Sequence, residues 1–308
     1  MKVNRIRQNV FPVLAAFIWG TAFVAQSVGA DYVEPFTFNT ARSGIAFLFL
    51  LVLCALLRRR RKQDFAGEAK VVPSARRDLA VAGICCGAAL TVASFLQQKG
   101  LETTTSGKAG FITALYIVLV PIAGIFLKKF PPRTVWLSVV LAVAGLYCLC
   151  ITEDFSITMG DFYILLCAFC FTAHILVIDH FTQKVDGVEL SCVQFLVVTI
   201  LSAIGMFATE SPSLAALQAC AFPVLYVGIF SSGVAYTLQI LAQKDSDPTV
   251  VSLLLSLESV FATLAGAVIL HDQMSLKEYF GCLLMLAAVI LAQLPEPKSG
   301  RKKAVSSN

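Results

Sequence analysis

The chain alternates between long apolar runs and short polar breaks along almost its whole length. A run of 18 or more apolar residues can cross a hydrocarbon layer of about 30 Å as a helix. An outer-membrane barrel would instead show alternating segments of about ten residues. The pattern therefore predicts an all-α membrane protein with ten transmembrane helices, at residues 9–29, 35–57, 78–98, 107–128, 133–151, 160–180, 189–209, 221–242, 248–270 and 276–294.

The same order of runs and breaks occurs twice, with a period near half the chain. Gln98 and Gln243 each precede a lysine at the end of an apolar run and lie 145 residues apart, whereas Trp136 and Tyr279 lie 143 apart. A period of this length indicates a duplicated unit rather than a short-period solenoid. The expected organisation is a cytoplasmic N-terminus at 1–8, a first five-helix repeat at 9–151, a second at 160–294 and a basic cytoplasmic tail at 295–308.

Composition and charge fix the class and the orientation. The 308 residues are 57% hydrophobic and 14% charged, where soluble domains carry about 25% charged residues. With the N-terminus inside, only Lys99, Lys108 and Lys277 fall on outside segments, Arg42 lies within a span, and the other 20 of the 24 Lys and Arg lie inside. This bias predicts a multi-pass protein of the plasma membrane with both termini cytoplasmic. The net charge of +5 then belongs to the cytoplasmic rim and requires no nucleic acid.

Five spans in each repeat is an odd number, so the second repeat must insert upside down. Inverted repeats of this kind are a common architecture of secondary transporters. Two similar halves in opposite orientation can exchange conformations, which opens a binding site at the midplane to each side in turn.

Several segments resemble the EamA-type members of the drug/metabolite transporter superfamily. They are Ala16-Phe17-Ile18-Trp19-Gly20, its echo Ala168-Phe169-Cys170-Phe171, Arg42, Pro121 and Leu257-Glu258-Ser259-Val260-Phe261-Ala262. The resemblance covers residues 9 to 294 and implies ten helices, cytoplasmic termini and export of small metabolites or drugs, often amino acids. Two departures stand out: Ser259 occupies a position where the family often has Pro, and His271-Asp272 replaces a frequent Gly-Glu pair.

Polar side chains inside the spans are the candidates for substrate binding, because charges are costly in lipid. Arg42 could hold a carboxylate or reach the membrane surface. Glu258 could bind a cation, carry a coupling proton or pair with Arg42, and a structural role is equally compatible with its position. His174 is a candidate proton carrier, although a lone buried histidine is more often a core group. The full set of expected substrate-binding residues is Trp19, Arg42, Tyr116, His174, Tyr236, Gln239 and Glu258.

We expect Trp19, Tyr116 and Tyr236 to form amphipathic walls of a cavity shared with His174 and Glu258. Pro121 lies inside the fourth span and should kink it. Bent helices at paired positions often mark a transport site, but the ninth span has no matching proline.

Other functional classes find less support in the sequence. No GxxxxGK[ST] loop, Ser/His/Asp arrangement or HExxH motif occurs, and most of the ten cysteines lie inside apolar runs. The alternative to a transporter is an integral-membrane enzyme or lipid-handling protein, which would cluster ligands at one membrane face. We expect no enzyme activity, cofactor or metal. The expected partners are a small-molecule substrate and the lipid bilayer, with a proton as candidate coupling ion. The substrate, the coupling ion and the oligomeric state, a homodimer among the options, stay open.

Overall fold

A computed structural model describes residues 6–64, 76–128, 130–150, 158–244, 246–269 and 274–294. All regular structure within these residues is helical. The elements are η1 (Ile6–Val10), α2 (Phe11–Ala30), α3 (Pro35–Asp64), α4 (Arg76–Gly100), α5 (Ser106–Thr113), α6 (Tyr116–Phe126), α7 (Arg133–Cys150), α8 (Met159–Phe181), α9 (Gly187–Thr209), α10 (Leu214–Ala219), α11 (Ala221–Tyr226), η2 (Val227–Ala235), α12 (Tyr236–Gln243), α13 (Pro248–Leu255), α14 (Glu258–Ile269) and α15 (Leu276–Gln293).

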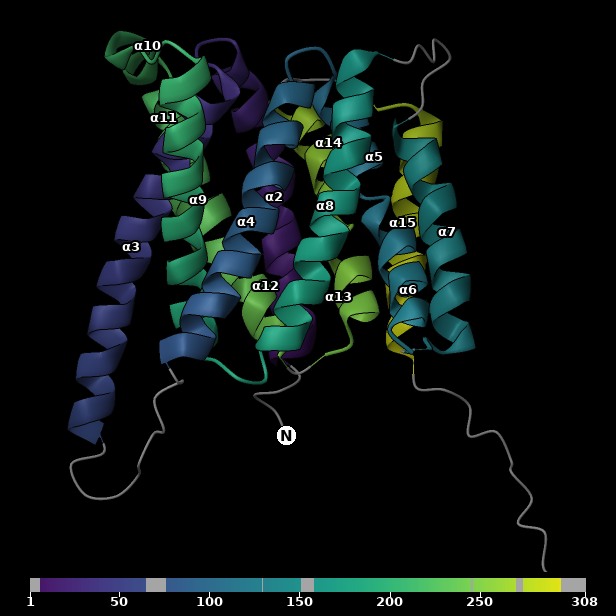
Figure 1. Ribbon diagram of the computed structural model, residues 1–308. Helices are drawn as coiled ribbons and strands as arrows, with labels where there is room; N and C mark the ends of the chain where they lie inside the picture. Colours follow the sequence, from purple (N-terminus) through teal and green to yellow (C-terminus); the bar gives the residue numbers. More distant parts are fainter. Residues whose placement is uncertain are drawn as a thin grey trace, which may run out of the picture.

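The helices reproduce the ten predicted spans. Nine segments within the described residues are long and apolar enough to cross a membrane, and Arg133–Leu149 is a shorter apolar helix. Spans 4, 8 and 9 each comprise more than one helix: α5 with α6, α11 with η2 and α12, and α13 with α14. The short helix α10, which the hydropathy pattern did not predict, lies beyond the end of α9 (Figure 1). The C-terminal tail, residues 1–5 and His271-Asp272 lie outside the described residues.

Equivalent spans of the two repeats pair with each other at the edges of the bundle. Span 5 (α7) packs along span 10 (α15), and span 2 (α3) packs along span 7 (α9); Figure 1 shows these pairs at opposite edges. The other contacts also occur twice. The helix α4 packs on α8 as η2 and α12 pack on α2, and α6 packs on α8 as α14 packs on α2. The contacts thus show the internal two-fold relation that the duplicated sequence predicts.

Glycines set the closest approach at two of these crossings. A Cβ atom on Gly281 would lie 2.7 Å from the carbonyl of Gly145, where α15 crosses α7. A Cβ atom on Gly20 would lie 2.6 Å from the Cβ of Phe261, where α2 crosses α14. Small residues let helix backbones approach closely in membranes, where dispersion rather than water exclusion drives packing.

Spans 4 and 9 are interrupted at equivalent positions. In span 4 the amides of Leu115 and Ile117 bond to carbonyls three residues back, at 3.2 and 3.0 Å. In span 9 the amides of Leu257 and Ser259 do the same, at 3.3 and 3.2 Å. The spacing between matching residues is 142 in both cases. The two interruptions are therefore one feature of the repeat.

The break in span 4 does not lie at Pro121. The helix α6 continues through Pro121, and the interruption precedes it at Ala114–Leu115. A proline disturbs the turn before it, because its ring meets the carbonyl four residues back. Span 9 breaks without a proline, and there the Ser256 hydroxyl donates to the Leu253 carbonyl at 2.7 Å. A paired break thus exists although a paired proline does not.

Candidate functional site

A cavity lies between the two repeats, with walls from spans 1, 2, 3, 4, 6, 8 and 9. It contains about 460 Å³ of atom-free space, part of which opens to solvent. Its lining residues are Trp19, Phe23, Gln26, Arg42, Gln97, Thr113, Tyr116, Phe171, Ile175, Ser231, Tyr236, Gln239, Leu255 and Glu258. Six of the seven residues expected to bind substrate belong to this wall; the exception is His174.

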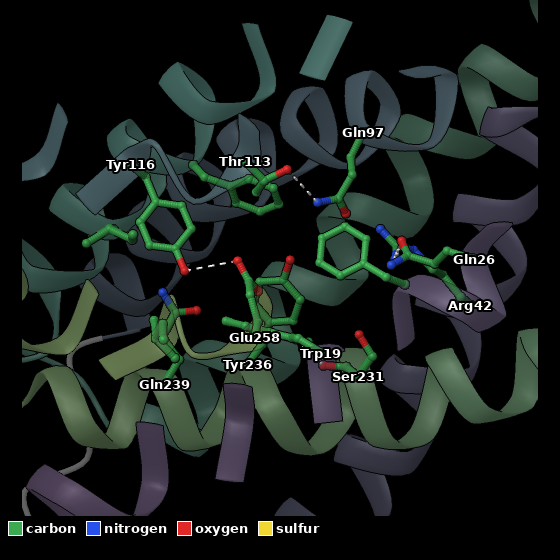
Figure 2. Close-up of a pocket in the computed structure, with 14 residues that line it drawn as sticks. Trp19, Gln26, Arg42, Gln97, Thr113, Tyr116, Ser231, Tyr236, Gln239 and Glu258 are labelled. Carbon is green, nitrogen blue, oxygen red and sulfur yellow. Dashed lines mark hydrogen bonds between the residues drawn. The ribbon is translucent and has the colours of Figure 1, made fainter. Parts of the chain in front are cut away.

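Tyr116 and Glu258 meet at one end of the cavity. Each is the first residue of the helix that follows a break, and they occupy equivalent positions 142 residues apart. The Tyr116 hydroxyl donates to Oε1 of Glu258 at 3.1 Å (Figure 2). Glu258 is only 4% exposed. The interruptions of spans 4 and 9 are therefore joined by a hydrogen bond between side chains of opposite repeats.

Arg42 occupies the other end of the cavity. Its Nη1 donates to Oε1 of Gln26 at 2.9 Å, and Figure 2 shows this pair on the side away from Tyr116 and Gln239. Arg42 is 4% exposed and its Nε has no hydrogen-bond partner. The guanidinium thus points into the protein instead of reaching the membrane surface.

The pairing of Arg42 with Glu258, one of the alternatives considered above, is not present in this conformation. The ion pairs found within the described residues are Arg58–Glu189, Lys99–Glu102 and Lys108–Asp161. Arg42 and Glu258 instead bond to uncharged partners, Gln26 and Tyr116. The cavity therefore holds one basic and one acidic side chain whose charges are not neutralised by each other.

An aromatic wall joins the two ends. The rings of Trp19 and Tyr236 lie 4.8 Å apart between centroids, and the Trp19 indole donates to the Ser231 carbonyl at 3.3 Å. Phe195 contacts Tyr236 edge-on at 5.6 Å. Tyr236 is thereby held by rings from spans 1 and 7, which fixes the apolar surface that a bound solute would meet.

His174 lies one layer behind this wall. Its ring contacts Tyr236 edge-on at 5.9 Å, and its Nε2 lies 3.1 Å from Oε1 of Gln194. The side chain is completely buried and its Nδ1 has no partner. The sequence placed His174 in the shared cavity, whereas the structure separates it from that space by Tyr236.

The wall also contains an irregular helix. Span 8 contains the π-helical segment η2, whereas the equivalent span 3 is the continuous α-helix α4. π-Helical segments are frequent at functional sites. Here η2 ends immediately before Tyr236, at the cavity.

Several lining residues were not in the expected set. They include Gln26, Gln97, Thr113 and Ser231. The duplication of the sequence could have identified such residues as equivalent pairs. Phe171 lies 152 residues after Trp19, and Leu255 lies 142 residues after Thr113. In each pair both members line the cavity.

The comparisons with known proteins agree with this architecture. The model of the EamA-like transporter family matches residues 8–151 and again residues 158–294. This chain belongs to the EamA-like transporter family. A protein of Archaeoglobus fulgidus named as an uncharacterized transporter is 33% identical over 300 residues, which cover 95% of this chain and 87% of that protein.

The fold of this EamA-like protein also matches a solved structure. A crystal structure superimposes with a TM-score of 0.75 at 18% sequence identity, over 93% of this chain and 96% of the other. At this identity the likeness concerns the fold alone. The family identifies a multi-pass membrane protein of a transporter family, and the cavity between its repeats is the candidate site.

Proposed function

We propose that this protein is a secondary active transporter of the cytoplasmic membrane, which exports a small metabolite by alternating access. The observation that carries the proposal is the Tyr116–Glu258 hydrogen bond. It joins the breaks of spans 4 and 9 across the interface of the repeats, inside the cavity. Export is the direction that the family resemblance implies, and the distribution of Lys and Arg supports cytoplasmic termini.

The two ends of the cavity favour a zwitterionic substrate with an apolar body. The Arg42 guanidinium can bind a carboxylate through two parallel hydrogen bonds. The Glu258 carboxylate at the other end can accept from an ammonium group. Between them, Trp19 and Tyr236 offer an aromatic surface. Among the substrates considered for this protein (metabolite, amino acid or drug), an apolar amino acid matches all three surfaces.

The paired breaks supply a means of alternation. Each break replaces bonds between residues four apart with bonds between residues three apart, and such irregular turns act as hinges. In one conformation the Tyr116–Glu258 bond holds the hinges together. If one break straightens while the other bends, the two repeats exchange roles and the cavity opens to the opposite side.

Glu258 is also the proposed site of proton coupling. A substrate ammonium and a proton would compete for the same carboxylate, so binding of one would release the other. Export could then be driven by proton entry. Replacing Glu258 by Gln keeps the shape and one hydrogen-bond acceptor but removes the charge.

The test combines a ligand screen with flux measurements. We expect apolar amino acids to raise the unfolding temperature of the purified wild-type protein, and proteoliposomes to transport whichever of them do so. Glu258→Gln should stay folded, lose flux driven by a proton gradient and retain exchange of substrate across the membrane.

Two results would contradict the proposal. The substrate class is wrong if apolar amino acids neither stabilise the protein nor cross the membrane. Glu258 is not the coupling site if Glu258→Gln transports as well as wild type under a proton gradient.

A further inference from the structure

The first and second repeats also meet along α3 and α9. The two helices run antiparallel, with Phe36 beside Gly205 at one level and Gly44 beside Thr199 at the next. At the far end of this contact, Cys54 and Cys192 lie close together, because the Cys54 sulfur is 3.8 Å from the carbonyl of Val188, one turn before Cys192 on α9. Both side chains are buried. Two cysteines thus face each other across the junction of the repeats.

Charged residues surround this pair on one side. Arg58 lies one turn after Cys54, and its Nη2 and Nε contact Oε1 of Glu189 at 2.8 and 3.0 Å. Arg58 and Glu189 both retain exposed surface. Because exposed charges avoid the hydrocarbon layer, this end of α3 and α9 belongs at the membrane–water boundary.

A small cleft leads from that boundary to one of the two thiols. Its lining residues are Cys54, Leu57, Arg58, Asp186, Val188 and Glu189. Cys54 also contacts the Val188 carbonyl, with 3.8 Å between sulfur and oxygen. Cys192 is not part of this lining and lies behind Cys54. A small water-soluble oxidant would therefore reach Cys54 first.

We propose that Cys54 and Cys192 form an oxidation site, at which a peroxide converts the two thiols into a disulfide between the repeats. The sulfur of Cys54 attacks a peroxide oxygen, the O–O bond breaks, and Cys54 becomes a sulfenic acid while its thiol proton and the displaced hydroxide leave as water. The sulfur of Cys192 then attacks the Cys54 sulfur, forms the S–S bond and displaces a second water. The two thiols lose two electrons and two protons, and hydrogen peroxide is reduced to two molecules of water.

The disulfide would stop transport, a consequence that rests on the proposed function. Alternating access requires the two repeats to move against each other, and a covalent bond between α3 and α9 fixes this end in its present packing. Cys167 and Cys170 could not act in this way, because both lie on α8. Disulfides in reducing compartments are typically transient and sense the redox state. Reduction by a thiol would restore movement.

The experiment uses the full chain in proteoliposomes, treated with hydrogen peroxide and then digested for mass spectrometry. Wild type should yield a cross-linked peptide that joins Cys54 to Cys192, and dithiothreitol should release it. Cys54→Ser and Cys192→Ser should each abolish that peptide. In a matched control, Cys192→Ser/Val193→Cys moves the thiol onto the face of α9 that packs against Gly83 of α4, and it should not cross-link to Cys54.

The outcomes separate the site from its consequence. Absence of the Cys54–Cys192 peptide in oxidised, folded wild type would overturn the oxidation site, whatever the transport activity. If the peptide forms, peroxide should abolish wild-type flux reversibly and spare Cys192→Ser. Full flux in cross-linked protein would overturn the regulatory consequence. If no variant transports under any condition, the proposed function fails, while the peptide still decides the oxidation site.

Discussion

At the scale of single residues, the cavity contains buried charges that the protein does not neutralise by pairing. Among the described residues, Gln26 is the hydrogen-bond partner found for Arg42, whose Nε has none. The guanidinium also lies over the ring of Phe38, 6.0 Å from its centroid. A buried charge without an ionic partner destabilises a fold. The presence of a buried, unpaired Arg42 is explained if the carboxylate of a bound ligand pairs with its guanidinium.

Arg42→Met separates a binding role from a structural one. Methionine fills similar space without the charge, and replacing buried charges by apolar residues is often neutral or stabilising by about 1–4 kcal/mol. We expect an unfolding temperature equal to or above that of wild type, together with loss of amino-acid-induced stabilisation. Thermal unfolding in detergent, with and without ligand, measures both. A large drop in the unfolding temperature would show that Arg42 serves the fold instead.

Tyr116→Phe tests the bond between the two breaks. The change removes one hydroxyl; a hydrogen bond to a charged group contributes about 1.5–3 kcal/mol, and one between uncharged groups about 0.5–1.5 kcal/mol. The control is Tyr226→Phe, which removes a comparable bond at 2.5 Å to the hydroxyl of Thr21, outside the cavity lining. In equilibrium unfolding Tyr116→Phe should lose more stability than Tyr226→Phe, because only the Tyr116 hydroxyl bonds to a carboxylate. Only Tyr116→Phe should change the pH profile of flux; equal profiles would remove Tyr116 from the mechanism.

At the scale of helices, the break in span 9 occurs where α2 closely approaches the start of α14. Gly20 of α2 faces the start of α14, so that an added Cβ would lie 2.7 Å from the Glu258 carbonyl and from the Ala262 amide nitrogen. The backbone atoms there cannot move aside as a flexible side chain can. The position of Glu258 in the cavity therefore depends on a missing side chain in span 1.

Gly20→Ala should displace α14 from α2. Overpacking of this kind costs about 1–3 kcal/mol. Gly44→Ala is the matched control, because its added Cβ would lie 3.7 Å from Thr199, an ordinary contact. Alanine also favours a helix over glycine by up to about 1 kcal/mol, so this control should be neutral or stabilising. Unfolding by denaturant in detergent compares the two, and equal stabilities would contradict the packing described for α2 and α14.

At the scale of the whole molecule, the internal two-fold relation fixes which helix ends share a side. Ten crossings put the start of span 1 and the end of span 10 on the same side of the bundle. The excess of Lys and Arg predicts that this side is the cytoplasm. The arrangement of helices alone does not distinguish the two compartments, because it is the same for either insertion.

Single cysteines in a background without the ten native ones test this orientation. We expect Lys277→Cys and Ser156→Cys to react with an impermeant thiol reagent from outside the cell; Ser156 lies outside the described residues. Lys184→Cys, on a predicted cytoplasmic loop, should react only after lysis. The opposite labelling pattern would reverse the predicted topology and, with it, the side to which the Cys54–Cys192 cleft opens.

The sequence by itself determined the number of spans, the duplication and most of the chemistry of the cavity. Spans can be located from hydropathy because a chain in lipid must satisfy its backbone hydrogen bonds within each helix. Polar side chains inside a membrane span are costly in free energy and are therefore candidates for a functional role. On this ground the sequence selected Trp19, Arg42, Tyr116, Tyr236, Gln239 and Glu258. Each of these inferences depends only on the hydrocarbon that surrounds a single span, and not on how the spans pack together.

Only the tertiary structure decided which of those residues meet and where the helices break. The hydrogen-bond partner of Glu258 is Tyr116 rather than Arg42. His174 lies behind Tyr236, a position that the hydropathy of its span does not indicate. No proline lies at the break of span 9, so no residue near the break predicts it from the sequence. These features depend on distances between segments about 140 residues apart in sequence, which packing of the two repeats sets and no local pattern encodes.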